Sequence, residues 1–137
     1  MFGEKFATRL NSFSSKPDIF WKKQAPSLTV DKLIERAGTV AGLTDLDLNF
    51  PDHAGDNLKN TVNLIKDNGM GINGFAMRYY TNPAFKMGAF TNPDKKVREE
   101  ALNLTKRGID AARESNSNLM TIWLGQDGYD YGFQVDY

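Results

Sequence analysis

The chain has 137 residues, of which 40% are hydrophobic and 25% are charged, and its 17 basic residues balance its 17 acidic ones. This is the composition of an ordinary globular protein with one core, which argues against a disordered chain, a collagen-like fibre and a nucleic-acid binder held by charge. No stretch reaches the roughly 18 consecutive apolar residues of a membrane span, and the N-terminus lacks the apolar region of a signal peptide. We therefore expect a soluble, cytoplasmic protein with neither a membrane nor a nucleic acid as partner.

The absence of cysteine narrows the chemistry that the chain can carry. There can be no disulfide, no thiolate nucleophile and no cysteine-ligated zinc, and His53 is the one histidine. Any chemistry must therefore depend on carboxylates, amides, aromatic side chains and this imidazole.

The first half of the chain alternates between extended and helical patterns. Residues 6–13 predict a first strand, and residues 16–21 indicate a loop. Thr29 is expected to cap a helix that runs to about Ala37, because its hydroxyl can accept a hydrogen bond from an amide of the first turn. A second strand is predicted where apolar and polar residues alternate, with Leu46, Leu48 and Phe50 as the apolar members.

The second half repeats this alternation. A helix is predicted over residues 56–67 and a third strand over residues 72–80. After the loop of residues 81–91, Asn92 is expected to cap the clearest helix, with Pro93 at its first position. This helix should end near residues 116–118, and residues 119–124 predict a fourth strand.

The predicted order is β-α-β-α-β-α-β, which indicates an α/β fold with about four parallel strands and three intervening helices. A complete (β/α)8 barrel needs about 250 residues, so this chain is expected to hold about half of one. The alternatives are a small open parallel sheet and a fragment whose remaining strands lie in sequence outside these residues.

Candidate ligand-binding residues follow the predicted strands, where parallel α/β proteins bind their ligands. They lie in residues 51–53, 81–86 and 123–128. Aromatic side chains at strand ends can cover the apolar face of a sugar ring, while amides and carboxylates bind its hydroxyls. The ordinary alternatives are a loop histidine for His53 and core packing for Phe85 and Trp123.

Two long segments resemble the xylose isomerase family of TIM barrels. The first is Asn-Pro-Ala-Phe-Lys-Met-Gly-Ala-Phe-Thr-Asn-Pro-Asp at residues 82–94, and the second is Ile-Trp-Leu-Gly-Gln-Asp-Gly at residues 122–128. Residues 8–13 and the Leu-Asp-Leu-Asn-Phe-Pro run at residues 46–51 look more like the L-rhamnose isomerase-like branch. The resemblance spans nearly the whole chain and covers the N-terminal half of the family's barrel. It implies that residues 1–137 form a single N-terminal portion of a TIM-barrel domain.

The resemblance implies a ketol isomerase that opens a cyclic aldose and moves a hydride between C1 and C2, with divalent ions (Mn, Mg or Co) polarising the oxygens. It implies His53 as the ring-opening catalytic residue, its tautomer fixed by Asp52 or another carboxylate. It also implies Phe85 and Trp123 as the aromatic pair around the substrate and Thr81 as a polar neighbour.

The family's metal ligands lie on later strands, so this chain is expected to bind no metal and to be inactive alone. The expected partners are an aldose or ketose, the C-terminal half of the barrel and, at full length, further copies of the protein. Two other functions stay open: a non-catalytic half-barrel that binds a sugar or a partner, and a sugar epimerase on the same scaffold.

Overall fold

The protein, described by a computed structural model over residues 4–20 and 28–128, contains one parallel β-sheet. Its strands lie in the order β1 (Ala7–Arg9), β2 (Asp45–Phe50), β3 (Gly71–Arg78) and β4 (Met120–Trp123). Each strand pairs in parallel with the next along the chain. This sequential order is that of a singly wound barrel, because a doubly wound sheet changes direction at a switch point. The predicted α/β fold is confirmed, and the arrangement is consistent with a partial TIM barrel.

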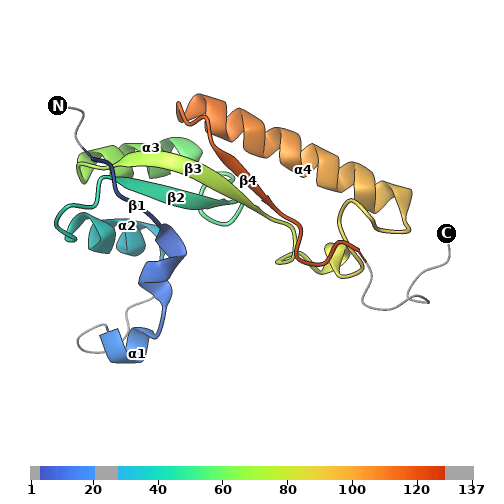
Figure 1. The fold of residues 1–137 in the computed structure, drawn as a ribbon, viewed down its shortest axis with the longest axis horizontal. Coiled ribbons are helices and arrows are strands. Elements are labelled where there is room, and N and C mark those ends of the chain that lie inside the picture. Colours follow the sequence, from blue (N-terminus) through green and yellow to red (C-terminus); the bar gives the residue numbers. More distant parts are fainter. Residues whose placement is uncertain (1–3, 21–27, 129–137) are drawn as a thin grey trace.

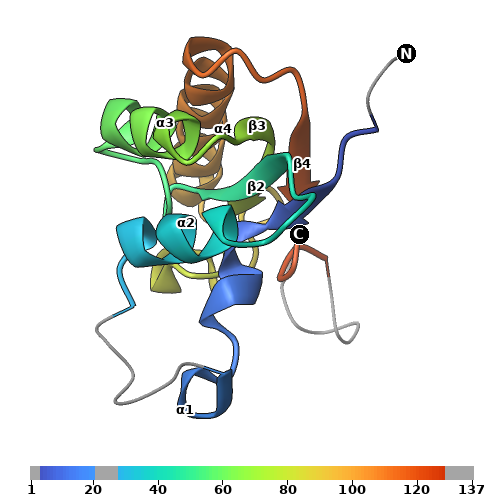
Figure 2. The same cartoon turned by 90° about the vertical axis from the view of Figure 1, so that its left-hand side faces the viewer.

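Three helices connect the strands and cover one face of the sheet (Figures 1 and 2). They are α2 (Val30–Gly38), α3 (Leu58–Asp67) and α4 (Lys95–Glu114). The short helix α1 (Pro17–Phe20) projects from the N-terminal part of the fold, and two 3-10 turns are η1 (Leu10–Ser14) and η2 (Pro83–Phe85). The other face of the sheet carries no helix among the described residues.

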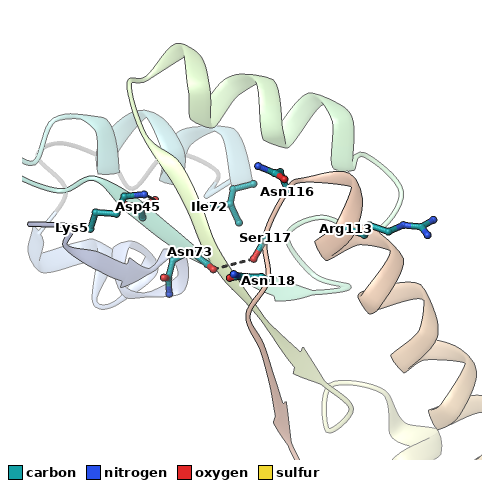
Figure 3. A pocket seen from close by; sticks show the side chains of 8 residues that line it. All are labelled: Lys5, Asp45, Ile72, Asn73, Arg113, Asn116, Ser117 and Asn118. Atoms are coloured by element: carbon teal, nitrogen blue, oxygen red, sulfur yellow. Dashed lines mark hydrogen bonds and ion pairs between the residues drawn. The ribbon is translucent and has the colours of Figure 1, made fainter. Parts of the chain in front are cut away.

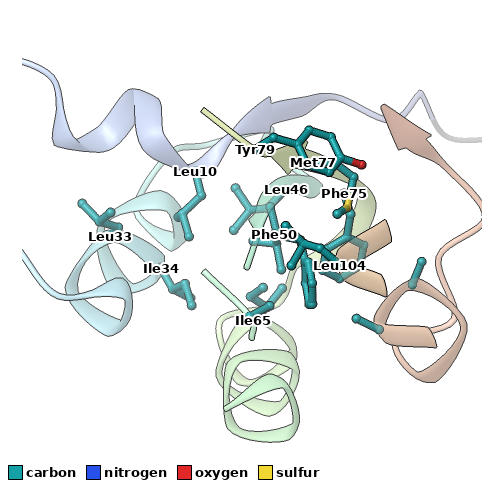
Figure 4. Close-up of a cluster of buried hydrophobic side chains, with 14 of the residues drawn as sticks. Leu10, Leu33, Ile34, Leu46, Phe50, Ile65, Phe75, Met77, Tyr79 and Leu104 are labelled. Atoms are coloured by element: carbon teal, nitrogen blue, oxygen red, sulfur yellow. The ribbon is translucent and has the colours of Figure 1, made fainter. Parts of the chain in front are cut away.

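The core lies between the sheet and these helices (Figure 4). Because side chains alternate along a strand, the apolar residues of β2 share one face and its polar residues share the other. Burying each large apolar side chain contributes about 1.5–3 kcal/mol, which is what holds the helices on this face. The largest fully buried side chains are Phe75, Phe85, Leu10, Ile34, Leu46, Leu48, Ile65 and Met77.

Helix α4 lies close against β3 because Gly108 has no side chain at the point of contact. A Cβ atom there would overlap the sulfur of Met77 and lie 3.2 Å from the terminal carbon of Met120. The close approach lets the small residues Ala101, Ala111 and Ala112 of α4 pack into the same core.

The caps of two helices show where the sequence patterns succeed and fail. Thr29 caps α2 as predicted, since its hydroxyl accepts a hydrogen bond from the amide of Lys32. The prediction of Asn92 as the cap of α4 is wrong, because Asp94 accepts from the amide of Lys96 at 2.8 Å. Asn92 instead stabilises the preceding turn: it donates to the carbonyl of Gly88 and accepts from the amide of Asp94.

Two predictions in the N-terminal part are also wrong. The first strand ends at Arg9 rather than residue 13, because Leu10 turns into the core and the chain continues as η1, where the Ser14 hydroxyl donates to the carbonyl of Asn11. The predicted loop contains helix α1 over Pro17–Phe20, and its Trp21 lies outside the described residues. Within the described part, no helix has the length and apolarity that a membrane crossing requires.

Candidate functional site

The candidate site lies at the carboxyl ends of β2, β3 and β4, where the sheet register brings successive loops together. Phe50 pairs with Met77 and Arg78 pairs with Trp123, so these strands end at neighbouring positions. The turn with His53, the loop with Thr81 and the segment after Trp123 therefore start side by side. This is the edge at which parallel α/β proteins bind ligands.

His53 is held by the end of β2 itself. Its backbone amide donates to the carbonyl of Asn49 at 2.8 Å, and its Nδ1 atom accepts a hydrogen bond from the amide of Asn49 at 3.0 Å. The backbone of Asn49, rather than Asp52 or another carboxylate, thus fixes the tautomer. With Nδ1 occupied as an acceptor, the neutral ring carries its hydrogen on Nε2.

Burial lowers the pKa of His53 from 6.5 to about 4. The carboxylate of Asp52 opposes this shift and the guanidinium of Arg78 adds to it, but desolvation is the largest cause. At neutral pH the imidazole is therefore uncharged, and it suits donation of a hydrogen bond from Nε2 better than proton abstraction.

This lowered pKa predicts how stability depends on pH. Between pH 4 and 6.5 the unfolded chain binds a proton at His53 that the folded chain does not, so the free energy of unfolding should fall as the pH drops through this window. His53→Gln should remove that part of the dependence. Urea unfolding of both proteins at pH 7.0 and 4.5 measures it, and an equal loss in the two would contradict the assignment.

Arg78, the last residue of β3, connects the parts of this edge. Its Nε atom lies 3.6 Å from Oδ2 of Asp52, and its guanidinium carbon lies 4.7 Å from the ring centroid of Tyr80. Arg78 also pairs with Trp123 of β4 in the sheet register. Its charge also acts on His53, so Arg78 links the histidine turn to the aromatic side chains.

The predicted residues Trp123 and Thr81 are both accessible. Trp123 is 52% exposed, and the guanidinium carbon of Arg9 lies 5.8 Å from its ring centroid. Thr81 is exposed, and its hydroxyl donates to the carbonyl of Arg78 at 3.4 Å. Both residues therefore lie where a ligand at this edge can reach them.

Phe85 does not join them, because the structure places it in the core instead. It is 1% exposed, and its ring packs edge-on against Tyr79 with 5.9 Å between centroids. The aromatic residue of this loop that stays accessible is Tyr80, which is 37% exposed. Its ring lies beside Gly125, where an added Cβ atom would be 3.3 Å from it.

Tyr80 and Arg78 are the residues that the sequence patterns missed. Both fall inside the predicted third strand of residues 72–80, where alternation alone does not distinguish the core face from the ligand face. Their position at the carboxyl end of that strand could have identified them as candidate ligand-binding residues.

Asp127 ties the segment after β4 to the loop after β3. One carboxylate oxygen, Oδ1, accepts hydrogen bonds from the amides of Ala89, Phe90 and Thr91 at 3.0, 2.7 and 2.7 Å, and from the Thr91 hydroxyl at 3.0 Å. Successive amides that point at one oxygen form an anion-binding nest, which a residue of the chain itself fills here. Gly88 makes the nest possible, since it adopts a φ of 98° and a Cβ atom there would lie 2.7 Å from Oγ1 of Thr91.

The described residues do not form a metal site. No group of three or more histidine, cysteine, aspartate or glutamate side chains comes together in residues 4–20 and 28–128. Asp52 pairs with Arg78 and Asp127 fills the nest, so neither is arranged as a ligand. The side chains of this described part therefore do not fit a divalent ion.

A pocket of about 470 Å³ lies at the opposite end of the strands (Figure 3). It is lined by polar side chains that include Lys5, Asp45, Arg113 and Asn116. The carboxylate of Asp45 lies 3.8 Å from the ammonium group of Lys5, and a hydrogen bond from Ser117 to the carbonyl of Asn73 closes one side. The amino ends of barrel strands serve stability rather than catalysis, so the carboxyl ends remain the candidate site.

Comparison with known proteins supports a relationship to a sugar isomerase. The chain is 28% identical to xylose isomerase of Thermus thermophilus over 107 residues. The match covers 75% of this chain and 28% of that protein, so the chain spans less than a third of the relative's length. No family model matches the chain.

Proposed function

We propose that this chain forms the N-terminal part of an aldose-ketose isomerase and supplies contacts to the sugar. The observation that carries the proposal is the meeting of His53, the Asp52–Arg78 pair, Tyr80 and Trp123 at the carboxyl ends of successive parallel strands. The similarity to a xylose isomerase supports a sugar-isomerase-like origin. The finer assignment to the L-rhamnose isomerase-like branch depends on residues 8–13 and 46–51.

In this proposal each residue has a role that its geometry allows. Uncharged His53 donates a hydrogen bond from Nε2 to the ring oxygen of the cyclic sugar, which assists ring opening. Trp123 and Tyr80 present aromatic faces to the apolar side of the sugar, and the Thr81 hydroxyl binds at its rim. Phe85 supports this surface from the core.

The other parts of the proposed enzyme come from outside these 137 residues. They are the remaining strands of the barrel, the ligands of a divalent ion (Mn, Mg or Co) and the contacts of a cytoplasmic homo-oligomer. The proposed activity is therefore that of the complete barrel.

Sugar binding by the isolated chain tests the proposal. D-Xylose and L-rhamnose are titrated into the isotopically labelled protein, and the signals of the Trp123 indole and the His53 imidazole are followed by NMR. Both signals should shift saturably, and Trp123→Phe should weaken binding severalfold. Shifts confined to residues around Asn116, at the amino ends of the strands, or no shifts at all would contradict it.

A second candidate function is non-catalytic sugar binding, which needs only the accessible side chains of Tyr80, Thr81 and Trp123 at this edge. Aldose isomerisation by the isolated chain in the presence of manganese can exclude this second function. Sugar binding without turnover agrees with either function, whereas turnover by the isolated chain would show that it assembles a complete site.

A further inference from the structure

A contact between Arg9 and Trp123 joins the two edge strands of the sheet. Arg9 ends β1 and Trp123 ends β4, and both β2 and β3 lie between these strands. The guanidinium carbon of Arg9 nevertheless lies 5.8 Å from the centroid of the Trp123 ring, which is within the range of a cation–π interaction. The side chain of the first strand therefore reaches that of the fourth without any pairing of their backbones.

The contact lies on the face of the sheet opposite the core. Arg9 lines a cavity of about 30 Å³ together with Asp47, Gly74 and Thr121. Asp47 belongs to the polar face of β2, because the residues before and after it in the strand are buried in the core. Gly74 contributes no side chain to this face, which leaves room for the long side chain of Arg9 to cross the sheet.

Arg9 is available to Trp123 because the nearest carboxylate on this face has another partner. Arg9 pairs with Asp47 in the sheet register, yet no carboxylate of the described residues lies within 4.0 Å of its guanidinium nitrogens. Oδ1 of Asp47 instead accepts a hydrogen bond from Nδ2 of Asn73 at 2.7 Å. Asn73 is the extra residue where the register between β2 and β3 shifts, so this bulge directs its amide to Asp47.

Little else fixes the ring of Trp123. The residue is 52% exposed, and its indole nitrogen has no hydrogen-bond partner among the described residues. Exposed side chains change rotamer within picoseconds to nanoseconds unless a contact holds them. An aromatic ring that is already held in its binding orientation loses less conformational freedom when a ligand stacks on it, and it binds that ligand more tightly.

We infer that Arg9 is a positioning residue, which orients the Trp123 indole so that the ring is ready to stack on a sugar. The guanidinium group covers one face of the ring and leaves the other face to the ligand. The inference rests on the proposed function, and it adds a residue of β1 to a site whose other residues follow β2, β3 and β4. Arg9 itself need not touch the sugar.

The first test measures the order of the indole without any sugar. Nitrogen-15 relaxation of the Trp123 Nε1 atom is recorded in the 137-residue chain and in three variants. Arg9→Met keeps the length of the side chain without the charge, Arg9→Lys keeps a cation, and Arg107→Met is the control on the exposed surface of α4. The order parameter should fall from about 0.8 to below about 0.6 in Arg9→Met, and it should stay near the wild-type value in Arg9→Lys and in the control.

The second test measures sugar binding by the same proteins. D-Xylose and L-rhamnose are titrated with NMR detection. The dissociation constant should rise about fivefold in Arg9→Met, as expected for the loss of one exposed cation–π contact, and less than about twofold in Arg9→Lys. Because Arg9 is exposed, the melting temperature of both variants should stay near that of the wild type.

The two measurements together separate positioning from direct contact. An indole that stays equally ordered in Arg9→Met would overturn the inference, since weaker binding would then mean that Arg9 touches the sugar itself. A disordered indole with unchanged sugar binding would also overturn it and would leave the proposed function standing. Failure of the wild type to bind either sugar would overturn the proposed function, and the order of the indole would then describe a structural contact alone.

Discussion

Asp127→Ala is expected to lower the free energy of unfolding by about 2–3 kcal/mol, because three backbone amides and a hydroxyl lose one charged acceptor. The loss should concentrate in the loop of residues 88–91 and the segment after Trp123. Hydrogen exchange at the amides of Ala89, Phe90 and Thr91 measures it locally, and urea unfolding measures it globally.

Two further variants separate the charge of Asp127 from its hydrogen-bond geometry. Asp127→Asn keeps one acceptor oxygen without the charge and should lose less stability than the alanine variant. Asp110→Ala removes an exposed carboxylate of α4 that lies 3.8 Å from Arg113, and it should change stability by less than about 0.5 kcal/mol. Similar effects of Asp127→Ala and Asp110→Ala would show that the nest contributes little.

Phe85→Ala is expected to cost about 3–5 kcal/mol of unfolding free energy, the range for removing a buried aromatic ring. The ring fills the core beside Tyr79, so its loss leaves a cavity that the surrounding side chains cannot close. Denaturant unfolding gives the value directly. A loss below about 1 kcal/mol would mean that Phe85 belongs to an open surface after all.

Tyr80→Ala is the matched comparison, since it removes an aromatic ring five residues earlier in the same loop. Its stability should change by less than about 1 kcal/mol, because the ring is 37% exposed and contacts Arg78 and Gly125. Sugar binding should respond in the opposite order, with a larger loss for Tyr80→Ala than for the conservative variant Phe85→Leu. A reversed order would return the substrate-facing role to Phe85.

Much of the fold was predictable because its signals are local. The alternation in β2 marks the face that joins the core, and the hydroxyl of Thr29 caps α2 within three residues. The errors occurred where two local signals competed. Asn92 and Asp94 both suit a cap, and the structure gives the helix cap to Asp94 while Asn92 bonds back to Gly88.

The site was less predictable because its determinants are distant in sequence. Asp127 meets its partners across 36–38 residues, and no local pattern indicates that a carboxylate will fill a nest of amides. Burial separates Phe85 from Tyr80, although both are aromatic residues of one loop. The pKa of His53 likewise depends on burial and on Arg78 from another strand.

The sequential order of the strands has a consequence for how the protein is made. Each strand pairs with the one synthesised just before it, so every new βα unit extends an edge that already exists. Folding can therefore follow translation from the N-terminus, without earlier segments waiting for a distant partner. Asp127 is synthesised after all four strands, and it then accepts hydrogen bonds from a loop made 36–38 residues earlier. This long-range contact should therefore form last.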